Sequence, residues 1–285
     1  MLSHVPQLPD LEARLRRWAR LGAALARDWG QQVRRAANTL GSGRRELVVM
    51  LLAYGAYTLV KGVAGGSLAV GTLNAERIVD LERRLGIYIE PGMQRYFIEH
   101  SLAMPFWNAL YVASQVIVLP LTFILVYRFA RRAYPFLRNM FFIAWTAGLV
   151  WYALQPVAPP RLAGIGFTDT VSTHTFFDLD SELVRAFYNP VAAMPSLHVG
   201  VAPIVGWALW RLTPWIWTRA LGVAYPLLVA TAVVVTGNHF VLDVAGGLIV
   251  VLPAAVIARL LTGSPLSLPS PTLGRRRAGG ARTSG

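Results

Sequence analysis

The chain has no cysteine and few charged residues. Without cysteine it can form neither disulfides nor thiolate metal sites, and its redox compartment is left undetermined. Only 14% of its 285 residues are charged, whereas 55% are hydrophobic, and this balance excludes an ordinary soluble globular protein. We also expect no secretory signal peptide, because residues 1–45 contain no apolar run of the kind that forms its core.

Acidic residues are scarce as well, with 14 Asp and Glu against 27 Arg and Lys, so the formal net charge is +13. A charge of this sign suggests nucleic-acid binding at first. The basic residues, however, lie in tails and short loops beside apolar runs, which is the placement that membrane topology requires. We therefore expect a membrane protein with no nucleic-acid partner.

Long apolar runs are plentiful, and several approach the ~20 residues that span a bilayer. Six predicted spans lie at about 46–66, 105–128, 139–157, 195–211, 219–236 and 239–261. Trp and Tyr residues cluster near their ends, as in interfacial belts. The sequence thus predicts an all-α, polytopic membrane protein whose six-transmembrane-helix domain covers residues 46–262.

Two segments flank this domain. Residues 8–33 place apolar side chains three or four positions apart, with arginines mostly elsewhere, so residues 1–45 read as a basic amphipathic segment on anionic lipid head groups. A poorly ordered basic tail is an equal alternative. Residues 263–285 are rich in Pro, Ser, Gly and Arg, and we expect them to be a disordered cytoplasmic tail.

The loop after the first span contains a further amphipathic stretch at residues 74–87. It places Ile78, Leu81 and Leu85 on one side, together with an Asp80/Arg84 pair at i,i+4. This pattern predicts a short helix that lies along the outer surface.

Orientation follows from the basic residues. With both termini on one side of the membrane, 20 of the 27 Arg and Lys residues share that side and 7 lie opposite. We therefore expect both termini in the cytoplasm, in a protein of a bacterial plasma membrane. His198, His239 and Arg161 then all fall at the extracytoplasmic face.

Two short segments carry most of the candidate chemistry. Residues 193–198 read Ala-Met-Pro-Ser-Leu-His, and residues 237–243 read Gly-Asn-His-Phe-Val-Leu-Asp. We expect Asn238 to cap the last span, with His239 in its first turn and Asp243 one turn deeper. Asp243 would then accept a hydrogen bond from one imidazole nitrogen and orient the other.

A second imidazole and a guanidinium complete the candidate site. Ser196 can cap the fourth span with His198 in its first turn, and two converging helix N-termini favour an anion. Arg161 adds a fork of donors suited to phosphate oxygens. This set predicts phosphoryl transfer without a bound metal: His239 attacks phosphorus and His198 protonates the leaving oxygen, then activates the acceptor.

Other interpretations of these residues stay open. Each histidine can simply cap a helix or bond locally, and His239 with Asp243 can be a structural pair. Arg161 can be an ordinary interfacial arginine. A zinc site built from His198, His239 and Asp243 would have an acceptable set of ligands.

The Pro-Ser-Leu-His and Asn-His-x3-Asp strings together resemble the second and third motifs of the type 2 phosphatidic acid phosphatase (PAP2) superfamily. The wider pattern over roughly residues 45–262 is similar to its inositolphosphotransferase branch, which includes fungal inositol-phosphorylceramide synthases. The resemblance implies a six-helix membrane core and metal-independent chemistry through a phosphohistidine. By position it makes His239 the nucleophile, Asp243 its partner and His198 the acid/base, and Arg161 matches the first motif.

The chain departs from the superfamily pattern at several positions. Leu154 stands where the first motif has a lysine, and Ala232 and Val233 stand where the third has Ser-Arg. The second motif usually reads Pro-Ser-Gly-His, but Leu197 replaces its glycine. Either Lys61, Arg185 or Tyr188 substitutes for the missing cations, or the substrate is a phosphodiester, which carries less charge.

These observations predict a membrane enzyme that acts on a lipid phosphate or phosphodiester head group, with a phospholipid or polyprenyl phosphate as substrate and no cofactor. Ser196, Asn238 and Lys61 join Arg161 as substrate-binding candidates. The alternative is a non-catalytic transporter of lipids or small molecules that keeps an anion-binding site. The sequence leaves the oligomeric state open.

Overall fold

The computed structural model describes residues 43–44, 46–53, 55, 58, 67–100, 103–174, 179, 189–212 and 215–263. Lys61 lies outside the described residues. So do the predicted amphipathic segment, except for residues 43–44, and the predicted disordered tail, except for residue 263. The chain divides into two compact units, Met1–Ala56 and Tyr57–Gly285. In the first unit, the described part of the predicted first span is helical, at residues 46–53 and 55.

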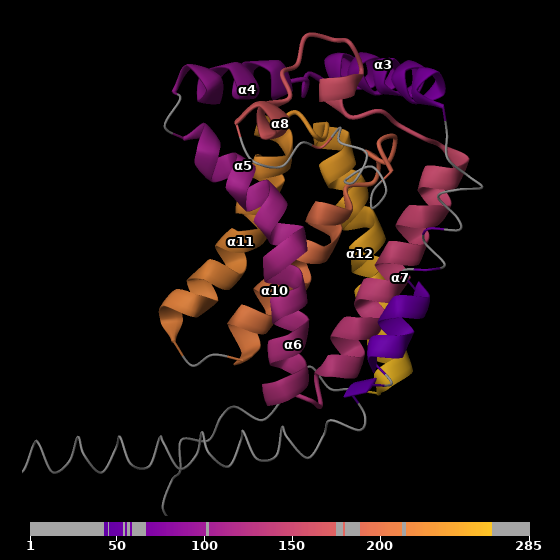
Figure 1. Cartoon of the computed structure of the whole chain (residues 1–285), viewed down its shortest axis with the longest axis vertical. Helices are drawn as coiled ribbons and strands as arrows, with labels where there is room; N and C mark the ends of the chain where they lie inside the picture. Colours follow the sequence, from indigo (N-terminus) through magenta and orange to yellow (C-terminus); the bar gives the residue numbers. More distant parts are fainter. Residues whose placement is uncertain are drawn as a thin grey trace, which may run out of the picture. The chain divides into compact units, whose positions relative to one another are not determined.

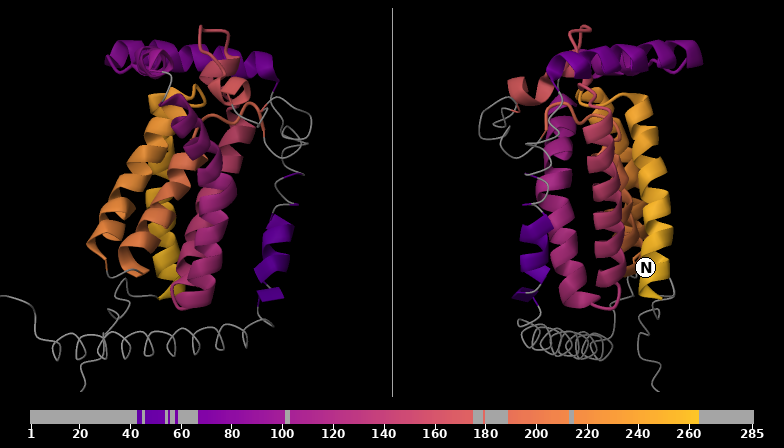
Figure 2. Two further views of the ribbon diagram at one scale, coloured as in Figure 1. Left: turned by 60° about the vertical axis from the view of Figure 1, so that its left-hand side comes forward. Right: turned by 90° about the vertical axis from the view of Figure 1, so that its right-hand side faces the viewer.

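The regular elements of the second unit are helices throughout its described part, and loops and turns join them. One isolated parallel bridge pairs Val157 with Ala192. Its elements run in the order α3 (Leu68–Leu85), α4 (Glu90–Glu99), α5 (Met104–Ala113), the π-helical η1 (Ser114–Val118), α6 (Leu119–Phe129), α7 (Tyr134–Leu154), the 3-10 turn η2 (Pro160–Leu162), α8 (Thr170–His174), α10 (Leu197–Leu212), α11 (Ile216–Val235) and α12 (Val241–Thr262). The helices α5, α6, α7, α10, α11 and α12 form a bundle, and α3 and α4 lie across one end of it (Figures 1 and 2). The all-α prediction is therefore confirmed.

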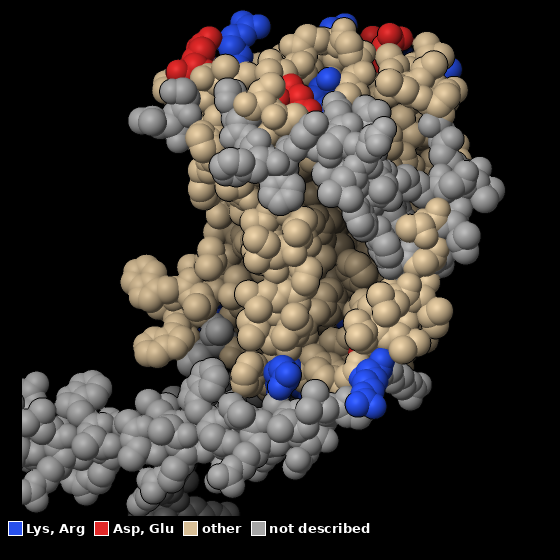
Figure 3. All heavy atoms as spheres, viewed as in Figure 1, with Lys and Arg blue, Asp and Glu red and all other residues tan. Residues whose placement is uncertain are grey.

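Three helical stretches of the described chain are long and apolar enough to cross a membrane: Met104–Phe129, Ile216–Val235 and Val241–Thr262. α10 is apolar but shorter, and α7 has 21 residues. These helices leave large apolar side chains exposed on their outer faces, such as Leu252 and Leu260 of α12. In Figure 3 the described charged side chains lie toward the ends of the bundle, and its flank is free of charge in this view. Lipid tails suit such a surface.

The core of the bundle is formed by the inner faces of α6, α7, α10, α11 and α12. Leu137 of α7 and Ile204 of α10 are fully buried there. α10 and α11 approach most closely at Gly206 and Gly222, where a Cβ on Gly222 would lie 2.6 Å from the carbonyl oxygen of Gly206. Small residues at such a crossing let two backbones come close and increase van der Waals contact.

The helix predicted at residues 74–87 is present within α3. Ile78 is buried, whereas Leu81 and Leu85 are 47% and 57% exposed. The buried face of α3 also carries the polar residues Asn74 and Glu82. Asn74 binds the segment that follows α7, because its Nδ2 donates to the carbonyl oxygen of Pro156 at 2.8 Å. α3 is thus a cover on the end of the bundle, and its buried face is partly apolar, at Ala75, Ile78 and Val79, and partly polar.

The α10–α11 crossing gives a test of this packing. Gly206→Ala would drive a Cβ into the carbonyl oxygen of Gly222, and we expect it to lower the free energy of unfolding by about 1–3 kcal/mol. Thermal unfolding in detergent, followed by tryptophan fluorescence, measures the loss. Gly92→Ala is the matched control, because its Cβ would meet nothing within 4 Å. Equal midpoints for the two variants would contradict the close crossing.

Candidate active site

The turn between α11 and α12 holds the first of the predicted residues. Gly237 adopts the left-handed conformation at φ 70°, and its N–H donates to the carbonyl oxygen of Val234. The N–H groups of Asn238 and His239 both donate to the carbonyl oxygen of Val233, at 3.1 and 3.0 Å. This pattern is a Schellman motif that ends α11. A Cβ on Gly237 would also lie 2.7 Å from Gln94 Nε2.

The prediction that Asn238 caps the last span is therefore wrong. α12 begins at Val241 and its N-cap is Phe240, because the backbone of Asn238 and His239 is used to close α11 instead. The side chain of Asn238 bonds within the turn, with Nδ2 3.0 Å from Thr236 Oγ1. His239 consequently precedes α12 rather than lying in its first turn.

His239 and Asp243 nevertheless lie side by side. The imidazole Nδ1 is 3.4 Å from Asp243 Oδ2, which is ion-pair distance but longer than a typical hydrogen bond. The same Oδ2 accepts the N–H of Phe240 at 2.8 Å. Asp243 is completely buried and His239 is 5% exposed. The carboxylate thus orients both the imidazole and the first turn of α12.

The N-terminal end of α10 lies beside His239 and Asp243. Ser196 precedes α10 as predicted, and its Oγ lies 3.5 Å from the N–H of Val199, while its own N–H donates to the carbonyl oxygen of Asp243 at 2.9 Å. His198 is the second residue of α10. Its ring stacks on Tyr111 of α5 at 4.5 Å between centroids and lies 5.8 Å from the ring of His239.

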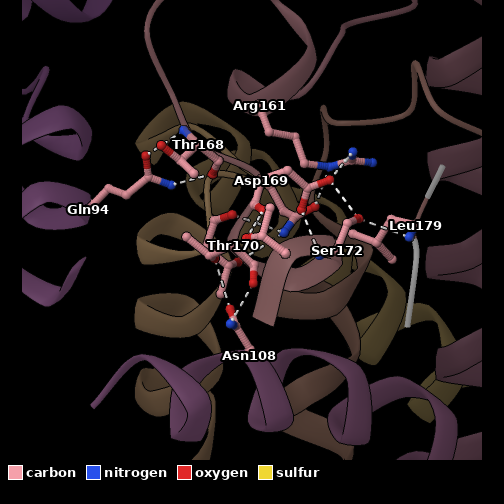
Figure 4. Close-up of polar contacts among 11 residues, drawn as sticks. Gln94, Asn108, Arg161, Thr168, Asp169, Thr170, Ser172 and Leu179 are labelled. Carbon is pink, nitrogen blue, oxygen red and sulfur yellow. Dashed lines mark hydrogen bonds and ion pairs between the residues drawn. The ribbon is translucent and has the colours of Figure 1, made fainter. Parts of the chain in front are cut away.

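Arg161 on η2 approaches from another part of the chain. Its backbone N–H donates to the carbonyl oxygen of Gly237 at 2.9 Å, and Nε donates to Asn238 Oδ1 at 3.0 Å. Its Nη1 forms an ion pair with Asp169 Oδ2 at 2.9 Å, and the Arg161 side chain is only 1% exposed (Figure 4). The guanidinium is therefore held in one orientation against the turn that bears His239.

The loop that carries Asp169 is fixed on both sides (Figure 4). Gln94 of α4 exchanges two hydrogen bonds of 3.0 Å with the backbone of Thr168. Asn108 of α5 exchanges two with Thr170, at 2.8 and 2.9 Å. Asp169 itself also accepts the N–H and hydroxyl of Ser172.

None of these loop contacts was predicted, and neither was a pair of buried carboxyl groups at the start of α12. Glu82 and Glu90 are completely buried and accept the N–H groups of Leu242 and Val241, both at 2.7 Å. Burial together with the neighbouring Glu90 and Asp243 raises the pKa of Glu82 to about 9. One signal could have pointed to them: both are acidic residues on segments with apolar neighbours.

Six of the seven predicted site residues are thus linked by direct contacts, and the seventh, Lys61, lies outside the described residues. Two imidazoles, a carboxylate and a buried guanidinium converge at one end of the bundle, beneath α3 and α4. This set can hold an anion and move a proton. Within the described chain, no group of three or more His, Cys, Asp and Glu side chains is arranged to hold a metal ion.

Comparison with known proteins bears on this site directly. Searches of curated proteins and of solved structures found no match. A family model described as the PAP2 superfamily matches residues 76–257. This range covers more than half of the chain and contains Arg161, His198, His239 and Asp243. The chain belongs to the PAP2 superfamily, whose members are generally phosphatases or phosphotransferases.

Proposed function

We propose that this protein is an integral-membrane phosphotransferase or phosphatase that acts on a lipid phosphate or phosphodiester head group through a phosphohistidine. The contact chain from Arg161 through Asn238 to His239 and Asp243, with His198 beside it, carries the proposal. Family membership supports the reaction class. The lipid substrate fits the apolar outer faces of the helices that end at the site.

In the first step the nitrogen of His239 that is not beside Asp243 attacks phosphorus. A P–N bond forms as the P–O bond to the leaving group breaks, and His198 donates a proton to the departing oxygen. Asp243 stabilises the positive charge that develops on the His239 ring. The Arg161 guanidinium holds the oxygens of the phosphoryl group.

In the second step an acceptor hydroxyl attacks the phosphohistidine. His198, now neutral, takes the proton from that hydroxyl, and the P–N bond breaks. Water as acceptor gives hydrolysis, and a lipid alcohol gives head-group transfer. Ser196 and Asn238 position the catalytic groups. Ser196 holds the start of α10, which carries His198, and Asn238 accepts a hydrogen bond from the Arg161 guanidinium.

We further propose that the site lies at the extracytoplasmic face of a six-span protein with cytoplasmic termini. The excess of Arg and Lys on the side of the termini supports this orientation. The described helices α7 and α10 would be two of the remaining spans. α3 and α4, which lie across the bundle end in Figure 2, would then rest at the level of the lipid head groups.

The charge balance at Arg161 favours a phosphodiester over a phosphomonoester. Asp169 neutralises this guanidinium at 2.9 Å, and Leu154 and Val233 occupy positions where the superfamily has cations. A monoester carries about −1.5 to −2 charges at neutral pH, whereas a diester carries one. Head-group transfer of the inositolphosphotransferase type is the reaction that suits this balance.

Trapping the covalent intermediate tests the proposal. We expect His198→Gln to accumulate label on His239 when given a radiolabelled p-nitrophenyl phosphoester, because that leaving group needs no protonation while the second step still needs a base. Acid-labile, alkali-stable label assigned by mass spectrometry measures it. Turnover of labelled lipids then separates the products: free phosphate indicates hydrolysis, and a new phosphodiester lipid indicates transfer.

The matched control for this test is His100→Asn, since the His100 ring is exposed and its described contacts are all with Tyr96, through the Tyr96 carbonyl oxygen and ring. It should turn over like the wild type, whereas His239→Asn should show no label and no turnover. Full turnover in His239→Asn would contradict the mechanism. Absence of label and turnover in the wild type, with lipid transport retained in His239→Asn, would favour the transporter.

Asp169→Asn tests the charge argument. Removing the negative charge from the guanidinium should raise kcat/KM for phosphomonoesters relative to phosphodiesters by about tenfold, or ~1.4 kcal/mol of differential binding. Asn keeps an acceptor for the N–H of Ser172, so the loop can retain its shape. Asp80→Asn, on the exposed face of α3, is the control. An unchanged ratio of the two kcat/KM values would refute a role of Asp169 in substrate choice.

A further inference from the structure

Two buried carboxyl groups that the proposed chemistry does not use hold the start of α12. Glu82 lies in the last turn of α3 and Glu90 is the first residue of α4. Each is completely buried, and each uses Oε1 to accept a backbone N–H, from Leu242 and Val241 respectively. Both acceptors therefore come from α3 and α4, and both donors come from α12, the helix that carries Asp243.

These N–H groups are the first two of α12, and a helix leaves such donors without partners of its own. They directly precede Asp243, the third residue of the helix. The position of the first turn, and with it the direction of the Asp243 side chain toward His239, consequently depends on the two glutamates. Negative charge at a helix N-terminus is also favoured by the helix dipole.

The second carboxyl oxygen of each glutamate lacks a protein donor among the described residues. Glu82 Oε2 and Glu90 Oε2 are buried and meet no N–H or O–H donor within the described chain. A proton on one carboxyl lets it donate to the other, which satisfies both oxygens at once. The same conclusion follows from electrostatics, because two ionised carboxylates this close, beside the buried Asp243, would repel strongly.

Several groups of the described chain act on the pair. Burial raises the pKa of Glu82 most, Glu90 and Asp243 raise it further and the Leu242 N–H lowers it, which leaves it at about 9. Tyr88, between α3 and α4, lies near both glutamates, and burial raises its pKa in turn. The Arg83 guanidinium is 5.1 Å from the centre of the Tyr88 ring.

We propose that Glu82 and Glu90 act as one pair that shares a single proton and positions Asp243, and through it His239, by holding the first turn of α12. They are positioning residues, not catalytic ones, and their effect on turnover rests on the proposed function. The sharing of the proton does not depend on that function. Loss of this proton separates the two carboxylates and releases the Val241 and Leu242 N–H groups.

The pair makes stability depend on pH in a defined direction. Between the unfolded pKa of 4.5 and the folded pKa of about 9, the folded chain carries a proton that the unfolded chain has lost. The free energy of unfolding contributed by Glu82 therefore falls as pH rises through this window and is level above it. Glu82→Gln removes the titrating group and should remove this slope.

Infrared spectroscopy of the purified full chain in detergent tests the shared proton. At neutral pH we expect the C=O stretching band of a buried, protonated carboxylic acid, which disappears as pH is raised past about 9. Glu82→Gln should lack this band, and Glu76→Gln, on the exposed face of α3, should keep it. A wild type without the band, or a Glu82→Gln variant that retains it, would overturn the proposal.

Activity and stability give the second readout. Wild-type turnover should decline near pH 9, Glu82→Gln should lose that alkaline limb, and Glu82→Asp, whose carboxyl falls short of Leu242, should lose about 10²-fold in kcat. An alkaline limb retained in Glu82→Gln would also overturn the positioning role. If no phosphoryl transfer is detected with any lipid while the band and the pH slope behave as expected, the proposed function fails and the proton-sharing pair stands.

Discussion

The carbonyl oxygen of Val233 is the acceptor on which the site depends. It takes the N–H groups of both Asn238 and His239, and so ends α11 and fixes the backbone that carries the imidazole. Arg161 binds the same turn through the Gly237 carbonyl oxygen and the Asn238 side chain. Two segments far apart in sequence are thereby joined at one backbone turn, and the side chains that they carry need little further ordering.

The molecule separates its apolar and polar tasks by position. The bundle presents apolar side chains outward and packs its core between helices, while the buried charged groups gather under α3 and α4 at one end. Isolating a charge from water costs several kcal/mol. Here that cost is offset by specific partners: Arg161 has Asp169, Glu82 and Glu90 have the α12 N–H groups, and Asp243 has Phe240 and His239.

Much of this could be predicted from the sequence, and the reasons are physical. Apolar runs of spanning length locate α5 with α6, α7, α10, α11 and α12 within a few residues, and the His239–Asp243 spacing places the two groups together even though His239 lies outside the helix. The predicted cap failed because Asn238 can close one helix or open the next, and only packing decides between them. Glu82, Glu90 and Asp169 were missed because burial of a carboxyl group depends on contacts between residues distant in sequence.

An experimental structure of the full chain with bound orthovanadate tests the central claim most directly. Vanadate mimics a phosphoryl group in transfer. Phosphoryl transfer through His239 predicts vanadium bonded to the imidazole nitrogen of His239 that does not face Asp243, with the Arg161 guanidinium on the vanadate oxygens and His198 beside them. Vanadate bound elsewhere, with His239 out of its reach in an active preparation, would contradict it.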